Sequence, residues 1–309
     1  MAFLQEPEPQ RGVPLQVLPG ISRIVAANPS VMTYHGTNTY LIAGDEGFTV
    51  IDPGPDNAAH VADIIAAAGD TRVVRIILTH THADHSGAVP ALAAATGAPV
   101  YGYGSEKLTP DMRVKDGEIF AGFTALHTPG HAADHLCFAY RLEDGRKILF
   151  SGDHVMSWSS SIVSPPGGDM LAYYRSLELL LERDDEIYLS GHGPLLEQPQ
   201  GLVRELLAHR QFREQTILAE LRQQDWAVAP LAEKLYHKTD AFLKIAAQRN
   251  VLAHMLKLKA EGIVTELEPD TMPHPDTLAI SRPPRGVPDQ GGARAALTYT
   301  DALRRFGLR

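Results

Sequence analysis

Four residues able to bind metal ions are crowded into a stretch of six, His80-Thr81-His82-Ala83-Asp84-His85. Neutral imidazole and carboxylate groups are ligands that suit zinc, iron or manganese. A single tetrahedral ion could not take all four from so short a loop, so we expect the segment to serve more than one ion. Capping of the following helix would use Asp84 or Ser86 but needs no three histidines, so capping alone does not explain the pattern.

Three later segments repeat this combination of candidate ligands with adjacent glycine. They are His127–His131, Ser151–His154 and Ser190–Pro194. Glycine lets the backbone turn sharply and approach other groups closely. Each segment alone is a weak indication, because a histidine at a turn is usually solvated or hydrogen-bonded. Together with the six-residue cluster, the three segments predict one composite metal site.

The elements that must position these residues follow an α/β rhythm over the first 200 residues, because short β-branched runs alternate with alanine- and leucine-rich stretches. Predicted strands are Ile21–Ala26, Tyr34–Ile42, Phe48–Asp52, Val73–Thr79, Phe123–His127, Leu136–Arg141, Lys147–Ser151 and Glu186–Ser190. Predicted helices are Ala58–Ala68, Ala88–Thr96 and Met170–Glu182. Each ligand segment follows a strand, where functional loops are commonly built. So many strands favour two sheets with helices on their outer faces.

A second unit begins after Gly201, where strands give way to helices. The expected elements are helices at Leu202–Gln223, Pro230–Tyr236 and Ala241–Ala260, a strand near Ile263–Leu267, and one closing helical turn near Thr300–Arg305. Two helices followed by a strand and a loop outline a winged-helix-like unit. The residues between Pro269 and Ala293 are rich in proline and glycine, so we expect no regular structure there.

These features divide the chain into four parts. The expected parts are an N-terminal extension (1–20), a catalytic domain (21–201), a helical winged-helix-like domain (202–268) and a Pro/Gly-rich tail (269–309). The formal charge of -9 argues against a protein whose whole surface grips phosphate backbones. The lone Cys137 excludes an intrachain disulfide framework and a multi-thiolate zinc site.

The N-terminus lacks the basic start and apolar stretch of an export signal. No apolar run approaches the roughly 20 residues needed to span a bilayer. We therefore expect a cytoplasmic protein without a membrane segment, whose oligomeric state the sequence does not predict.

The order of the ligand segments resembles the metallo-β-lactamase fold superfamily, whose pattern is an H-x-H-x-D-H loop followed by a histidine, an aspartate and a final histidine. The resemblance spans about residues 20–200 and implies an αββα sandwich. It implies one metal ion on His80, His82 and His131, a second on Asp84, His85 and His192, and Asp153 as a bridge. Two divalent ions, with zinc expected and manganese or iron as alternatives, could share a hydroxide and stabilise the oxyanion formed on its attack.

Within that superfamily, three segments are similar to the beta-lactamase-like protein 2 group. They are Gly36–Leu41, Tyr174–Leu181 and His192–Pro194. Together with the winged-helix-like end, they extend the resemblance to about residue 268. The group includes an endoribonuclease that acts on single-stranded RNA, while many bacterial relatives are uncharacterised, so the fold does not fix the substrate.

Single-stranded RNA is the leading substrate hypothesis, by this resemblance. Ten Lys and Arg residues stand against seven Asp and Glu residues between Val203 and Gly262. The candidate phosphate contacts are Lys244, Arg249, Lys257 and Lys259. Scattered cations are also typical of an ordinary solvated face, and no aromatic stacking platform is interleaved with them.

A small-molecule thioester, as cleaved by glyoxalase II, is the main alternative. It rests on the run Thr128–His131 and on His135, but Leu202–Leu267 shows no convincing set of basic residues for the carboxylates of glutathione. A β-lactam is less favoured, since Asp153 stands where the common subclass has a cysteine ligand. Lactone and phosphotriester hydrolysis stay open. A non-catalytic, metal-binding regulatory module is the alternative from another class, and the complete ligand set opposes it.

Further residues have expected roles around the site. Asp84 is a catalytic candidate beside its ligand role, and His154 could donate a proton to a leaving group. Asp134 and His135 are expected to orient metal-bound imidazoles. The long connection Met156–Gly168 is expected to border the pocket, with a plain surface loop as the alternative.

Overall fold

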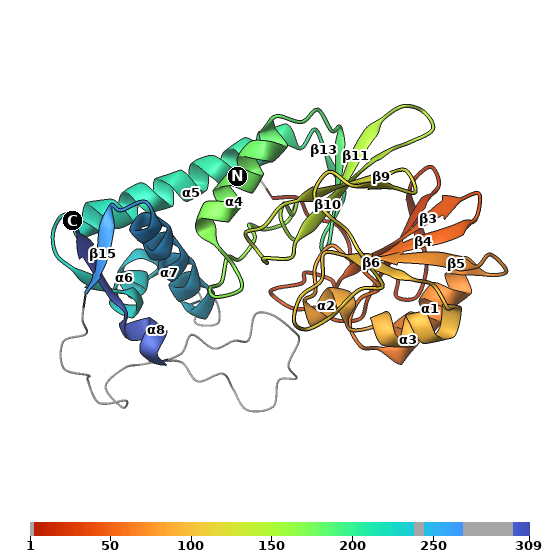
Figure 1. The fold of residues 1–309 in the computed structure, drawn as a ribbon, viewed down its shortest axis with the longest axis horizontal. Helices are drawn as coiled ribbons and strands as arrows, with labels where there is room; N and C mark the ends of the chain where they lie inside the picture. The colour runs from red at the N-terminus through yellow and green to blue at the C-terminus, as the bar shows by residue number, and fades with distance from the viewer. Residues whose placement is uncertain (1–2, 238–243, 268–298) are drawn as a thin grey trace.

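The computed structural model describes residues 3–237, 244–267 and 299–309, which form two face-to-face β-sheets and an adjoining helical unit (Figure 1). The first sheet has the order β1 (Leu15–Leu18), β2 (Ile21–Val25), β3 (Asn38–Gly44), β4 (Gly47–Ile51), β5 (Val73–Ile77), β6 (Val100–Gly102) and β7 (Met112–Arg113). The second has the order β13 (Leu196–Glu197), β12 (Ile187–Ser190), β11 (Lys147–Gly152), β10 (Leu136–Arg141), β9 (Phe123–His127) and β8 (Ile119–Phe120).

The main core lies between the two sheets, because successive side chains of a strand point to opposite faces. On β3, Tyr40 and Ile42 join this inner cluster, whereas Leu41 joins the cluster on the outer face. On β10, Phe138 points inward and Cys137 outward. Both faces of the central strands are thus buried, which explains their nearly continuous apolar sequences.

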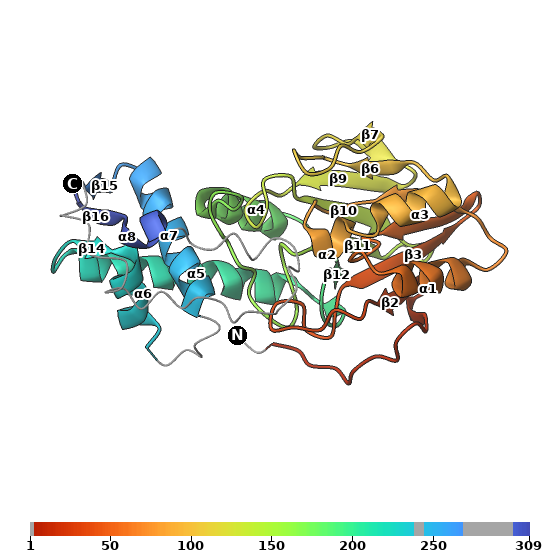
Figure 2. The ribbon, with the colours of Figure 1, turned by 90° about the horizontal axis from the view of Figure 1, so that it is seen from below.

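Helices cover both outer faces, as the sequence predicts. The first sheet packs against α1 (Ala58–Ala68) and α3 (Val89–Thr96), which lie together on one side of the molecule (Figure 2). The second sheet packs against α4 (Met170–Leu181) and the first turns of α5 (Gln200–Leu221). The expected αββα sandwich is therefore confirmed.

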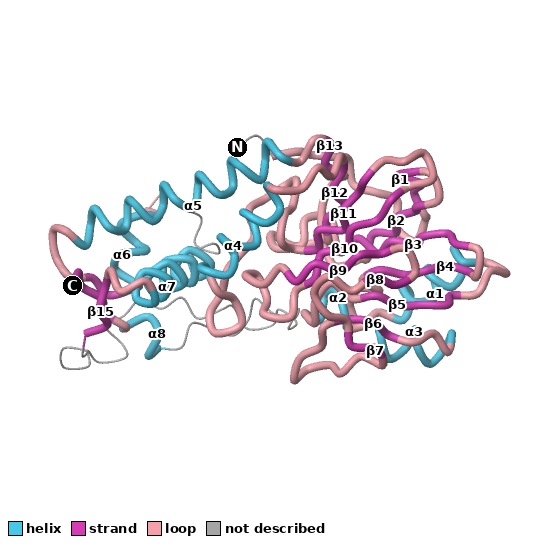
Figure 3. The backbone as a smooth tube through the Cα atoms, turned by 45° about the horizontal axis from the view of Figure 1, so that its top comes forward, coloured by secondary structure: helices cyan, strands magenta, loops and turns pink. Residues whose placement is uncertain are grey.

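The C-terminal unit contains α6 (Val228–Leu235), α7 (Lys244–Ala260) and the end of α5, and it lies on the side of the molecule opposite the sheets (Figure 3). A three-stranded sheet joins these helices. It has the order β14 (Trp226–Ala227), β16 (Arg305–Leu308) and β15 (Val264–Leu267), and α8 (Tyr299–Leu303) precedes β16. The expected winged-helix-like unit is confirmed by this arrangement.

The sequence did not anticipate β16, which lies in the middle of that sheet. Phe306 at its centre is buried in the same cluster as Val251 and Leu258 of α7. The last residues of the expected tail therefore belong to the core of the C-terminal unit, while the proline- and glycine-rich part, 269–298, lies outside the described residues. The four-part division of the chain stays a prediction. Among the described residues, no helix has both the length and the apolar character needed to cross a membrane.

Candidate metal centre

All seven predicted ligands come together where strands of both sheets end. The loop after β5 and the short helix α2 (Ala83–Ser86) carry four of them, and the segments after β9, β11 and β12 carry one each. They form two groups, His80 with His82 and His131, and Asp84 with His85, Asp153 and His192. The possible ligand atoms of each group lie within 4.8 Å of one another.

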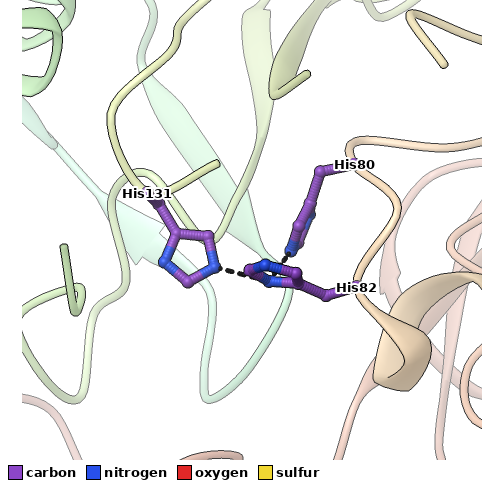
Figure 4. Close-up of side chains that lie close together, drawn as sticks. All are labelled: His80, His82 and His131. Atoms are coloured by element: carbon purple, nitrogen blue, oxygen red, sulfur yellow. Dashed lines mark hydrogen bonds between the residues drawn. The ribbon is translucent and has the colours of Figure 1, made fainter. Parts of the chain in front are cut away.

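In the first group, three ring nitrogens converge on one point (Figure 4). His82 Nδ1 lies 2.9 Å from His80 Nε2 and 2.9 Å from His131 Nε2. His131 Nδ1 donates to the carbonyl of Ile162 at 2.8 Å, so a neutral His131 ring keeps a lone pair on Nε2. One proton on His82 Nδ1 can serve only one of its two neighbours, whereas a cation could accept all three lone pairs.

In the second group, imidazole nitrogens face carboxylate oxygens at distances longer than good hydrogen bonds. His85 Nε2 lies 3.4 Å from Asp153 Oδ1, and His192 Nε2 lies 3.4 Å from Asp84 Oδ2. Four buried atoms here have no hydrogen-bond partner: His85 Nε2, His192 Nε2, Asp84 Oδ1 and Asp153 Oδ1. Because orphaned buried polar atoms are costly, this donor set fits a divalent cation.

Asp153 lies between the two groups. Its Oδ2 is 3.6 Å from His131 Nε2 in the first group and 3.5 Å from His192 Nε2 in the second. A carboxylate in this position can contact two cations at once, as the resemblance implies for a bridging ligand.

Asp52, which directly follows β4, orients two of the histidines and was missed from the sequence. Its Oδ2 accepts from His85 Nδ1 at 2.9 Å and from Thr79 Oγ1 at 2.7 Å. Thr79 Oγ1 in turn accepts from His80 Nδ1 at 3.0 Å, because its own hydrogen is used by Asp52. Each bond leaves Nε2 of the histidine free for a cation. The only sequence signal is an aspartate at the end of an apolar strand, beside the other ligand-bearing strand ends.

Asp134 and His135 hold backbone groups of the ligand segments and not the imidazoles, which corrects the sequence expectation. Asp134 Oδ2 accepts the Thr81 N–H at 2.9 Å, between two ligands. His135 Nε2 accepts the Asp153 N–H at 3.1 Å, while its Nδ1 donates to Thr128 Oγ1 at 2.9 Å.

Glycines are required where the ligand segments approach one another. A Cβ on Gly191 would lie 2.5 Å from Asp153 Oδ1 and 2.6 Å from His85 Cε1. A Cβ on Gly152, whose φ is +48°, would lie 2.5 Å from His135 Nε2. A side chain at Gly191 would displace two ligands, and one at Gly152 would displace His135, whose ring holds the Asp153 N–H.

Burial and charge set different protonation tendencies in the two groups. Burial lowers the pKa of His80 well below its ordinary value and that of His82 to about 3, so both rings are neutral and offer lone pairs. Burial also acts to lower the pKa of His85 and His192. The carboxylate of Asp153, with other acidic neighbours, outweighs it and raises the pKa of His192 to about 9 and that of His85 well above its ordinary value. A cation binding there competes with protons.

Comparison with known proteins decides the family. Residues 32–192, more than half of the chain, match the Metallo-beta-lactamase superfamily. The chain belongs to this superfamily. Residues 228–270 match the Beta-lactamase associated winged helix domain.

Relatives of this superfamily hydrolase include the Beta-lactamase-like protein 2 homolog of Drosophila melanogaster, which is 31% identical over 270 residues, 78% of this chain and 88% of the relative. The Atrochrysone carboxyl ACP thioesterase of Aspergillus chevalieri is 32% identical over 218 residues, 67% of this chain and 68% of the relative. A beta-lactamase domain protein from Burkholderia ambifaria has a crystal structure that superposes with a TM-score of 0.73. The superposition covers 97% of this chain and 95% of the Burkholderia chain, and the two sequences are 18% identical, so the similarity supports the fold alone.

His154 lies outside both ligand groups of this metallo-beta-lactamase superfamily hydrolase. Its ring is fully buried, neither nitrogen has a hydrogen-bond partner, and the ring centroid lies 4.7 Å from that of Tyr173. Burial lowers the pKa of His154 to about 3, so the ring is neutral at physiological pH. These features disfavour the predicted role as proton donor to a leaving group.

The connection Met156–Gly168 borders the ligand groups, as expected. Trp158 stacks on Tyr34 with ring centroids 5.1 Å apart, and it lies so close to Gly193 that a Cβ there would be 2.5 Å from its Cδ1. The connection therefore contacts the segment of His192 through Trp158 and His131 through Ile162.

Proposed function

We propose that this chain hydrolyses a small-molecule thioester or related ester, using two divalent metal ions held by the seven ligands described above. The convergence of buried, otherwise unpartnered nitrogen and oxygen atoms in two adjacent groups carries the proposal. Zinc is the expected ion, with manganese and iron as alternatives, because the donor set alone does not select among them.

Paired divalent cations supply a nucleophilic hydroxide near neutral pH and stabilise the oxyanion that develops during ester cleavage. The side chains of this protein have distinct tasks around them. Asp153 would set the separation of the two ions from its place between the groups. Asp84 would bind one ion, and its unpartnered Oδ1 could accept a proton. Asp52 and the carbonyl of Ile162 fix the imidazoles that face the ions.

The thioester is favoured because a relative covering two thirds of this chain is named as a thioesterase. The sequence-based RNA hypothesis loses support at its four candidate cations. Lys244 pairs with Glu233 at 3.0 Å, and Lys259 with Glu266 at 2.5 Å. The others are buried: Lys257 lies 2.8 Å from Glu214, and Arg249 donates to Ser164 Oγ at 2.6 Å.

Steady-state assays of the Zn²⁺-reconstituted chain on a thioester, a lactone, a β-lactam and a single-stranded RNA would test this function. We expect thioester turnover that falls by orders of magnitude in Asp153→Ala, since that side chain contacts both ligand groups. Asp144→Ala is the matched control, because Asp144 lies exposed in a turn, away from the ligand groups, and its carboxylate bonds to Arg146. RNA cleavage without thioester cleavage, or normal turnover by Asp153→Ala, would contradict the proposal.

A further inference from the structure

Residues 161–164, here called the 161–164 segment, contact two of the candidate ligands. The carbonyl of Ile162 accepts from His131 Nδ1 at 2.8 Å, which fixes the ring so that Nε2 faces the first ligand group. Ser161 Oγ lies within hydrogen-bonding distance of the carbonyls of Asp153 and His154. The position of this segment therefore bears on the imidazole of one ligand and on the backbone of another.

Side chains from the C-terminal helices hold the segment in place. Arg210 of α5 donates through Nη2 to the carbonyl of Ser161 and through Nη1 to Asn250 Oδ1 at 3.1 Å. Asn250 of α7 accepts at the same oxygen from the Val163 N–H at 3.4 Å. One buried guanidinium and one amide thus connect both helices to the backbone beside the ligands.

Arg210 is only 3% exposed, and its guanidinium lies 5.5 Å from the ring centroid of Tyr173. Tyr173 in turn donates its hydroxyl hydrogen to the carbonyl of His154, next to Asp153, at 3.1 Å. Both terminal nitrogens of this guanidinium find acceptors, in Asn250 and Ser161, while its Nε has no hydrogen-bond partner. Because a buried guanidinium is costly when its donors are unsatisfied, these two bonds favour one arrangement of the segment. Partners beyond the immediate ligands commonly tune metal affinity by such positioning.

We infer that Arg210 and Asn250 are positioning residues through which the C-terminal helices set the metal affinity of the site. The inference rests on the proposed metal-binding function. The two residues bond to the carbonyl of Ser161 and to the N–H of Val163, on either side of the Ile162 carbonyl that accepts from the ligand His131. Neither residue touches a ligand atom itself.

Two matched pairs of variants separate positioning from general destabilisation. Asn250→Leu removes the acceptor of the Val163 N–H and of Arg210, whereas Asn250→Asp keeps an oxygen acceptor at the same place. Arg210→Gln removes the guanidinium that bonds to the segment. Arg213→Gln removes a guanidinium from the same helix that does not bond to the segment but lies 4.3 Å from the ring centroid of Tyr236. If Arg210→Gln does not fold, the Asn250 pair still tests the inference.

The measurement is a calorimetric titration of metal-free full-length chains with Co²⁺, with the visible Co²⁺ spectrum recorded in parallel. We expect Asn250→Leu and Arg210→Gln to bind at least one Co²⁺ about 10- to 100-fold more weakly, with an altered spectrum, and the two controls to match the parent. Parent-like Co²⁺ affinity and spectrum in Asn250→Leu would overturn the inference. A parent chain that binds no Co²⁺ would instead contradict the proposed function on which it rests.

Discussion

At the scale of single residues, the Nδ1 atoms of several candidate histidine ligands are hydrogen-bonded to other residues of the protein. Asp52 takes the Nδ1 hydrogen of His85, and the carbonyls of Ile162 and Gly36 take those of His131 and His192. Each of these bonds selects the tautomer whose Nε2 carries a lone pair. Residues that are not ligands themselves thus orient the ligands for binding a cation.

Asp52→Asn tests this arrangement. Asparagine keeps the size of Asp52 and tolerates its φ of +51°, but it replaces one acceptor by a donor that cannot bond the Nδ1 hydrogen of His85. We expect Zn²⁺ affinity, measured by competition with a chromogenic chelator, to fall about 10- to 100-fold. The control Asp45→Asn changes an exposed turn and should bind like the parent. Equal affinities in all three chains would show that Asp52 does not orient the site.

The seven candidate ligands could be predicted from the sequence because all are histidine or aspartate and follow one another in the order typical of the family. The structure brings all seven together. It did not reveal Asp52 or Arg210, since an aspartate after a strand and an arginine in a helix are common and act here through long-range hydrogen bonds. His154 was assigned a catalytic role from its neighbour in sequence, but side-chain direction and burial are tertiary properties.

At the scale of elements, strands buried on both faces were predictable. β9 and β10 have the predicted bounds, Phe123–His127 and Leu136–Arg141, and helix α1 covers the predicted Ala58–Ala68. The short strands β7, β8, β13 and β14 were not predicted, because two residues carry no periodicity. β16 was missed because its pairing partners are distant in sequence.

Glu266 of β15 makes a pH-dependent contribution to the stability of the C-terminal unit. Glu266 accepts from Arg304 Nε at 2.6 Å and from Lys259 Nζ at 2.5 Å, and the hydrogen bond from Arg304 is the main cause that lowers its pKa from 4.5 to about 2. Since the folded pKa is the lower one, this carboxylate stabilises the fold above about pH 4.5, and the stabilisation is lost as pH falls toward 2.

Glu266→Gln should therefore reduce the free energy of unfolding at pH 7, and its difference from the parent should shrink as the pH falls below 4.5. Urea unfolding of parent and variant across this range measures the difference. Glu143→Gln, in an exposed turn, serves as the control and should follow the parent. A parent-to-variant difference that stays constant between pH 7 and pH 3 would rule out the role assigned to this carboxylate.

At the scale of the whole molecule, the C-terminal unit is joined to the sandwich by buried polar groups. Glu214 of α5 pairs with Lys257 of α7, whose ammonium lies 4.7 Å from the ring centroid of Tyr174 on α4. Arg210 and Arg249 are buried as well, so these three cations of the unit do not lie on a surface open to polyanions.

We therefore expect the double variant Lys244→Gln/Lys259→Gln to leave thioester turnover unchanged, and the parent chain not to retain a single-stranded RNA in a filter-binding assay at low salt. Both lysines are already paired with carboxylates, so each pair offers little positive potential to a polyanion. Tight RNA binding by the parent, with a salt dependence that flattens by roughly 0.7 per lost phosphate contact in the variant, would restore the nucleic-acid hypothesis.

The central claim is that one chain holds two metal ions through His80, His82, Asp84, His85, His131, Asp153 and His192. Native mass spectrometry of the chain after incubation with Zn²⁺ and removal of excess ion tests it most directly. The account predicts a dominant species with two Zn²⁺ per chain. A chain that retains no more than one tightly held ion, after incubation with either Zn²⁺ or Mn²⁺, would contradict it.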